Sequence, residues 1–309
     1  MTCPYDVFKG YIFQSVTKSD FPCQKGSLLV YFCKLVSMVL KMEIINKIPF
    51  GLRESDQSYV DVADVLNGKQ CGCICPSCKT PLQARQGKVR NWYFAHASKR
   101  VSDLTEKECD YSFWVSVLLM AKEAIRQGGK LKTPGCTKFL GHDELIVTDP
   151  REIDIMNPEI EQKGFDAYFN LGKYSIGVIF STPEKPCREI IDPDKKTGIL
   201  EISLASSNKL FYSEDRKFDY KTILRNIIFK DEFNKKWLYH PKIEFYKNKY
   251  GARLTDKPPF NIQAIVGDLI AIKHNFHKCD HCNIRWKGQP RCPDCQNKGV
   301  EVQRDENVR

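Results

Sequence analysis

Hydrophobic positions along the chain switch between helical and strand-like spacing, and they predict two helices on either side of a group of strands. The first helix is expected over residues 111–127, where apolar side chains recur every three or four positions until a Gly-Gly pair. The second is expected over residues 218–233, which carry one apolar face. Between them, four apolar runs separated by turns predict strands of one sheet, at residues 144–147, 165–171, 174–180 and 199–204. The order of helix, strands and helix predicts an α/β core.

Two cysteine-rich regions flank this core. The N-terminal one has strand-like pieces at residues 59–65 and 91–94, separated by Asn-Gly and Gln-Gly turns, which predict a small β-rich knuckle. After the C-terminal one, the chain ends in a polar stretch that is expected to be disordered. The expected divisions are, in order, residues 1–41, 42–112, 113–260, 261–300 and 301–309.

Residues 1–41 resemble no domain, and regular patterning starts at Met42. We therefore expect translation to begin at Met42, with the preceding residues a non-native or disordered extension. Their most apolar stretch, residues 27–40, is too short to span a bilayer and is interrupted by Lys34. A signal anchor is the alternative, but no stable association with a membrane is expected.

The C-terminal cysteines have the spacing of a zinc ribbon. Two Cys-x-x-Cys corners, separated by nine residues, can aim four thiolates at one tetrahedral ion. The ligands would be Cys279, Cys282, Cys292 and Cys295. The alternative is two disulfides or free thiols, and His281, inside the first corner, is expected to be exposed and not a ligand.

The N-terminal cysteines supply one good corner, Cys75-Pro-Ser-Cys78, which needs two further ligands. His96 and Cys109 are the natural candidates, and Cys71 or Cys73 is the alternative to one of them. The chain is thus expected to hold two structural zinc ions. Because thiols must stay reduced to bind metal, we expect a cytoplasmic protein.

Charge and aromatic content favour a nucleic-acid partner. The chain has 48 Lys and Arg against 38 Asp and Glu, with an otherwise ordinary globular composition. In residues 230–253, basic side chains alternate with aromatic ones, so they can contact phosphates while the rings contact bases. The alternative is an amphipathic segment with its rings in the core. The expected partner is DNA, with single strands among the forms considered, and the candidate contacts are Lys235, Lys236, Lys247, Lys249 and Arg253.

Residues 48–122 resemble the N-terminal part of the competence protein CoiA-like family, through IPFGLRESDQSYVDVADV and CGCICPSCKTPLQARQGKVRNWYFAHAS. The resemblance implies a cysteine-rich module followed by a nuclease domain of the PD-(D/E)XK, restriction-endonuclease-like class. The chain departs from the family at Tyr93, where a first histidine would stand, while His96 keeps the second. Trp114 and Leu118 stand where the family tends to carry Glu and His, so we expect that face of the helix to be core.

A nuclease of this class needs an Asp and a Glu that hold Mg²⁺, usually with a neighbouring Lys. Asp166 is the best candidate for the Asp. One alignment, slightly the more natural, puts Gly177 in place of the Glu. The other puts Glu201 there, without a lysine two residues later. Glu201 and Ser203 would share one face of their strand.

The predicted fold is α+β, a restriction-endonuclease-like core between an N-terminal zinc knuckle and a C-terminal zinc ribbon. Three functions stay open. The first is a catalytically degenerate nuclease domain that binds DNA during uptake or processing. The second is an active Mg²⁺-dependent DNA endo- or exonuclease that uses Asp166 and Glu201, with a migrated lysine such as Lys209. The third is a zinc-based adaptor for protein partners.

Overall fold

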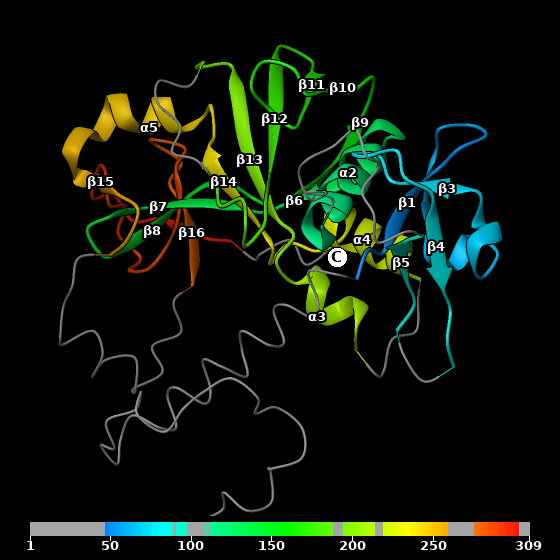
Figure 1. Ribbon diagram of the computed structural model, residues 1–309. Coiled ribbons are helices and arrows are strands. Elements are labelled where there is room, and N and C mark those ends of the chain that lie inside the picture. The colour runs from blue at the N-terminus through cyan, green and yellow to red at the C-terminus, as the bar shows by residue number, and fades with distance from the viewer. Residues whose placement is uncertain are drawn as a thin grey trace, which may run out of the picture. The chain divides into compact units, whose positions relative to one another are not determined.

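The computed structural model describes residues 47–88, 91–97, 109, 112–187, 194–213, 219–258 and 275–302 (Figure 1). The expectations for residues 1–41 and for most of the polar tail lie outside these residues. The described chain has a mixed α+β fold in which strands outnumber helices. Among the described helices, none combines the length and the apolar character that crossing a membrane requires.

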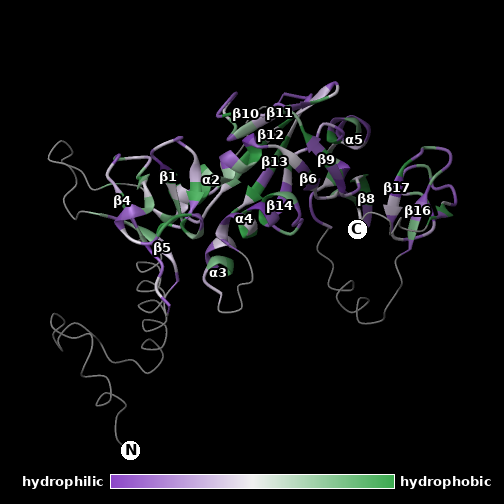
Figure 2. Cartoon of the chain, turned by 90° about the vertical axis from the view of Figure 1, so that its right-hand side faces the viewer, coloured by the Kyte–Doolittle hydropathy of each residue, from purple (hydrophilic) through white to green (hydrophobic). Residues whose placement is uncertain are grey.

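The central element is a five-stranded sheet in the order β10, β11, β12, β13, β14. Its strands are β10 (Glu159–Ile160), β11 (Ala167–Leu171), β12 (Tyr174–Ser181), β13 (Thr197–Ser203) and β14 (Lys235–Tyr239). β12 and β13 run parallel, whereas the other neighbours are antiparallel. Figure 2 shows the hydrophobic colouring of β12 and β13, which is typical of strands buried on at least one face. The three predicted strands at residues 165–171, 174–180 and 199–204 are confirmed as β11, β12 and β13.

Helices α2 (Phe113–Arg126) and α4 (Tyr220–Phe229) contact each other, and the short helix α3 (Ser207–Phe211) also contacts α4. The side-chain oxygens of Ser112 and Asp219 accept backbone N–H groups of the first turns of α2 and α4, as N-caps do. Trp114 is buried, as predicted from its apolar character, while Leu118 is only half-buried. Both predicted helices are therefore confirmed, with ends one to four residues inside the predicted limits.

A second, six-stranded sheet joins the chain's middle to its C-terminal part, in the order β15, β7, β8, β17, β16, β18. Its strands are β7 (Cys136–Leu140), β8 (Asp143–Thr148), β15 (Leu254–Thr255), β16 (Phe276–Lys278), β17 (Arg285–Lys287) and β18 (Val300–Glu301). The prediction that residues 144–147 belong to the same sheet as the other three strands is wrong. β8 pairs with β17, because Leu145 and Trp286 pack together in a buried cluster. The pair β6 (Gly129–Thr133) and β9 (Arg151–Ile155) forms a separate two-stranded sheet.

The N-terminal knuckle is β-rich, as predicted. It contains β1 (Phe50–Arg53), β2 (Tyr59–Asp61) and β3 (Cys73–Ile74) in one sheet, β4 (Leu82–Arg85) and β5 (Tyr93–His96) in another, and two 3-10 turns, Val62–Asp64 and Lys69–Cys71. The predicted strand at residues 59–65 ends early, because the Asp61 carboxylate accepts the Ala63 N–H and starts the first turn. The knuckle contacts the core through the Tyr220 hydroxyl, which donates to the Trp92 carbonyl over 2.9 Å.

Candidate metal centres and the carboxylate row

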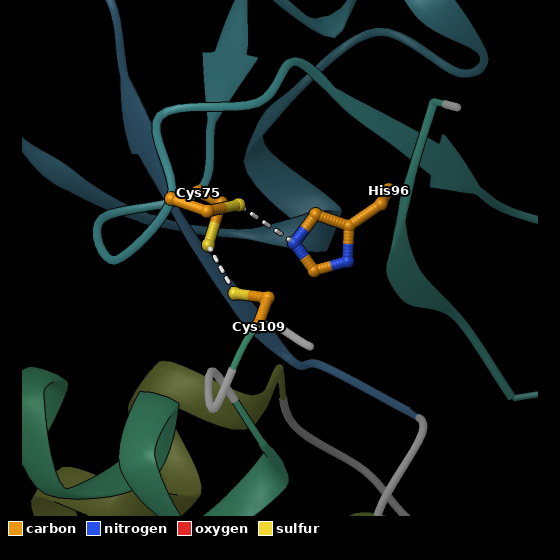
Figure 3. A group of neighbouring side chains, drawn as sticks. Cys75, His96 and Cys109 are labelled. Atoms are coloured by element: carbon orange, nitrogen blue, oxygen red, sulfur yellow. Dashed lines mark hydrogen bonds between the residues drawn. The ribbon is translucent and has the colours of Figure 1, made fainter. Parts of the chain in front are cut away.

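The N-terminal candidate metal centre brings four side chains from three distant parts of the chain together. Cys75 and Cys78 lie on the turn after β3, His96 ends β5, and Cys109 lies four residues before α2. One ligand atom of each lies within 4.8 Å of all the others. Figure 3 shows the side chains of Cys75, His96 and Cys109 converging on one point. The distances are 3.6 Å between the Cys75 and Cys109 sulfurs and 3.4 Å from the Cys78 sulfur to His96 Nε2.

The C-terminal candidate metal centre consists of Cys279, Cys282, Cys292 and Cys295, again within 4.8 Å of one another. The Cys282 sulfur lies 3.4 Å from that of Cys279, 3.5 Å from Cys292 and 3.1 Å from Cys295. His281 is exposed and lies outside the group, as predicted.

The same local turn builds all three Cys-x-x-Cys corners. The residue after the second cysteine donates its N–H to the carbonyl of the first, as Asn283 does to Cys279 over 2.8 Å. That residue is Lys79, Asn283 or Gln296, with φ of 59°, 54° and 61°. This left-handed conformation is uncommon outside glycine, and here it turns both thiols to one side. The corners are therefore formed by the backbone itself.

Protonation of the N-terminal group depends on what binds there. Burial raises the pKa of the Cys75 thiol, so without a nearby cation this sulfur stays protonated at neutral pH. Burial also lowers the pKa of His96, which keeps the imidazole neutral and able to coordinate through Nε2. Although burial opposes it, hydrogen bonding with Thr80 lowers the pKa of Cys78. The positive charge of a bound divalent cation would stabilise the thiolate form of these cysteines.

The two remaining cysteines of the N-terminal cluster lie outside the group. The Cys71 thiol donates to the Leu82 carbonyl over 3.1 Å, and the Cys73 thiol donates to the Cys71 carbonyl over 3.3 Å. Both are buried, and the structure brings His96 and Cys109 to Cys75 and Cys78 instead. All the described cysteines are free thiols. The described residues thus include two groups that can hold metal ions, one with three sulfurs and a nitrogen and one with four sulfurs.

Asp166 directly precedes β11 and is buried. Its Oδ2 accepts the Phe180 N–H over 2.9 Å. Its Oδ1 lies 3.1 Å from the ammonium nitrogens of both Lys122, on α2, and Lys185. Lys122 also contacts Glu161 over 2.7 Å. Lys122 and Lys185 were not predicted as partners of Asp166.

Glu201 lies in the middle of β13 and is also buried. Its Oε1 accepts the Ser181 hydroxyl over 2.5 Å, and its Oε2 lies 2.9 Å from the Lys236 ammonium. Strand register pairs Ile179 with Glu201 and Glu201 with Lys236. Because Ala167 pairs with Val178, Asp166 comes opposite Ile179. We call Asp166, Ile179, Glu201 and Lys236 the carboxylate row, since paired residues lie on the same face of a sheet.

Within the carboxylate row, the two acids are separated by the strand that carries Ile179. The electrostatic influence of both reaches Cys187, where burial raises the thiol pKa and Glu201 and Asp166 raise it further. Among the described residues, no group of three metal-ligating side chains within 4.8 Å includes Asp166 or Glu201. The lysines that contact the two acids are Lys122, Lys185 and Lys236. The expected Lys209 lies on α3.

Gly177, the other position considered for the acid, is enclosed by an aromatic ring. A Cβ atom added there would come within 2.6 Å of three ring atoms of Phe165. Real Cβ atoms do not approach other atoms so closely, so a side chain at this position requires the ring to move. The face on which a glutamate would project from β12 is therefore occupied by Phe165.

The five predicted DNA contacts do not form one surface. The Lys235 ammonium is buried and donates to the Asp231 carbonyl, and burial lowers its pKa to about 8. Lys236 belongs to the carboxylate row. The other three lie on or directly after α5 (Ile243–Tyr250): Lys247 with Glu244 at 3.7 Å, Lys249 with Asp294 at 2.5 Å, and Arg253 over the Tyr250 ring at 5.8 Å. Of the neighbouring aromatics, Tyr239 and Tyr250 are buried, whereas Phe245 is exposed.

Comparison with protein families gives one match. Residues 57–104 match the family model of the competence protein CoiA, N-terminal domain. No curated protein and no solved structure gives a significant match to the chain. The matched residues include Cys75, Cys78 and His96 of the N-terminal candidate metal centre, and they end before Cys109 and the core. Over these residues, the chain is similar to the N-terminal domain of competence protein CoiA, which supports a CoiA-like N-terminal module.

Proposed function

We propose that this CoiA-like protein binds DNA in the cytoplasm, during DNA uptake or processing, through a PD-(D/E)XK nuclease-like core that does not cut it. Two zinc ions stabilise its ends. The ligand sets support zinc, because three sulfurs with one imidazole, or four sulfurs, suit a tetrahedral structural zinc site. The antiparallel pair β11–β12, with Asp166 at its start and α2 before it, supports the nuclease-like assignment of the core.

The observation that carries the proposal is the neutralisation of both acids in the carboxylate row. Mg²⁺ prefers oxygen ligands in near-octahedral geometry and keeps several waters. The oxygens of Asp166 contact a backbone N–H and two ammonium groups, and those of Glu201 contact a hydroxyl and a third ammonium. The lysine ammonium groups already provide the positive charge that a bound Mg²⁺ would provide. This arrangement disfavours a divalent cation at the two acids.

The test uses the full chain loaded with zinc. Labelled single-stranded and duplex DNA are incubated with the protein in the presence of Mg²⁺ or Mn²⁺. We expect complexes whose affinity falls steeply with salt, and no cleavage products. Cleavage that depends on the added ion and that Asp166→Ala abolishes would overturn the proposal. Absence of any DNA complex at submicromolar protein would favour the protein-adaptor function instead.

An active nuclease is the second candidate, and one observation favours it. Asp166 and Glu201 are buried and share a face of the sheet, and Lys122 contacts Asp166. In that case Lys185 and Lys236, which are more exposed than Lys122, swing away as Mg²⁺ enters. Calorimetric titration with Mg²⁺ separates the two candidates. Heat that disappears in Glu201→Ala supports the nuclease, and no binding at millimolar Mg²⁺ excludes it.

A further inference from the structure

Helix α5 has one buried and one exposed side. Ile243 and Tyr250 are buried, and the Tyr246 hydroxyl donates to the Ile146 carbonyl of β8 over 3.5 Å. Beside the buried side lies a line of four exposed residues, spaced by three, four and four positions along the helix and the 3-10 turn η4 (Gly251–Arg253) that follows it. These residues, which we call the α5 stripe, are Lys242, Phe245, Lys249 and Arg253.

Phe245 is the unusual member of the α5 stripe. Phe245 is 60% exposed, although burial would stabilise a phenylalanine side chain. The Tyr246 ring lies edge-on to it, with 5.4 Å between the two ring centres. An exposed ring among lysines suits a hydrophobic protein partner poorly, because such an interface would also bury the charged lysines. A nucleic-acid base can stack on such a ring whatever its sequence.

Positive charge surrounds this ring. Residues 242–257 contain five basic and two acidic side chains. One of the acids, Asp256, is already neutralised by Lys138 of β7. The Arg253 guanidinium lies 5.8 Å and the Lys249 ammonium 5.4 Å from the centre of the Tyr250 ring. Both cations are therefore held beside a buried ring.

The α5 stripe is also fixed to the C-terminal candidate metal centre. The Lys249 ammonium lies 2.5 Å from the Asp294 carboxylate, in the second Cys-x-x-Cys corner. The same corner packs against Tyr250 and Tyr246 in one buried cluster. Because these contacts hold α5 in place, Phe245 and the basic side chains of the stripe have a fixed arrangement in the unbound protein. Such pre-organisation lowers the entropy lost on binding.

We propose that the α5 stripe binds single-stranded nucleic acid, with Phe245 stacking on an unpaired base while Lys242 and Arg253 contact the flanking phosphates. This inference rests on the proposed DNA-binding function and names its surface and the form of the ligand. A single ring on a convex helix reaches a base face only where the base is unstacked, so a duplex offers it phosphates alone. Single-stranded DNA and RNA share this chemistry.

The test compares two exposed phenylalanines in the full, zinc-loaded chain. Phe233, fully exposed in the loop before β14, is the matched control for Phe245. Labelled single-stranded DNA, single-stranded RNA and duplex DNA of about 15 nucleotides serve as probes, near the upper site size of one binding domain. We expect Phe245→Ala to weaken single-strand binding about tenfold, Phe245→Trp to retain it and Phe233→Ala to leave it unchanged.

A second pair of variants tests the phosphate contacts. Arg253→Gln should reduce the salt slope for single strands by about 0.7, the value for one lost phosphate contact. Lys247→Gln, on the same helix but outside the stripe, should leave the slope unchanged. Melting curves of each variant confirm that the fold is intact.

The outcomes separate this inference from the proposed function. If the wild type binds DNA but Phe245→Ala matches Phe233→Ala, the stripe is not the surface and the proposed function stands. Equal weakening of duplex and single-strand binding by Phe245→Ala would also overturn base stacking. If the wild type binds none of the probes, the proposed function fails and the inference fails with it. Weakening on only one of the two single-stranded probes identifies the natural ligand as DNA or RNA.

Discussion

The Asp61 carboxylate in the N-terminal knuckle accepts the backbone N–H of Lys221, in the first turn of α4, over 2.8 Å. Its other oxygen accepts the Ala63 N–H over 2.9 Å. Asp61 is fully buried, so one acid caps two elements that are 160 residues apart in sequence. The contact links the knuckle to the core, and its strength depends on pH.

Burial raises the pKa of Asp61 to about 6, and Asp219 and Asp64 add to the shift. A raised folded-state pKa means that stability is greatest at low pH and is lost as pH rises through about 6. The free energy of unfolding should therefore increase by about 1.4 kcal/mol between pH 7 and pH 5 from this group. Urea denaturation of the metal-loaded chain at these two pH values measures it.

Asp61→Asn is the variant that isolates this effect. Asparagine cannot ionise, so the pH-dependent increase should shrink by the amount that Asp61 contributes, whatever the change in overall stability. Glu54→Gln, which neutralises an exposed acid of the same knuckle, is the control and should keep the wild-type slope. An unchanged slope in Asp61→Asn would show that the buried carboxyl titrates normally.

Metal content should report directly on the N-terminal group. Cys109→Ser removes one of its four ligands and leaves the C-terminal four-sulfur group intact. We expect elemental analysis to give two metal ions per chain for the wild type and one for Cys109→Ser, because structural zinc sites need all four ligands. Cys187→Ser, which alters a cysteine outside both groups, should keep two. Two ions in Cys109→Ser would mean that Cys71 or Cys73 replaces the lost ligand.

Local sequence patterns predicted the helices, strands and Cys-x-x-Cys corners well, but they did not predict which distant strands pair. The Cys-x-x-Cys corners were readable from sequence because one short turn builds each of them. The pairing of β8 with β17 was not, since it depends on Leu145 and Trp286 meeting across about 140 residues of chain. Likewise, Lys235 reads as an exposed basic residue, but packing of β14 buries it.

The ion pair of Lys249 and Asp294 should stabilise metal in the C-terminal group. Asp294 interacts with the Cys282 thiol, and four thiolates around a divalent ion leave a net negative charge beside this acid. Lys249→Met removes the compensating ammonium, and we expect about tenfold weaker metal retention against a coloured chelator, as for other groups that support a metal site. Lys247→Met, two residues earlier and paired with Glu244, is the control. If the two variants retain metal equally, the ion pair of Lys249 and Asp294 does not stabilise the metal site.

Gly177 should resist substitution because of Phe165. Gly177→Ala places a methyl group where three atoms of the Phe165 ring lie at 2.6 Å, and such overpacking costs about 1–3 kcal/mol of unfolding free energy. The double variant Phe165→Ala with Gly177→Ala should lose less than the sum of the two single losses, because removal of the ring makes room for the methyl group. Urea denaturation of all four proteins measures this coupling. Additive losses would show that the Phe165 ring is not what opposes a side chain at position 177. Sub-additive losses would mean that the fold itself keeps an acid out of β12.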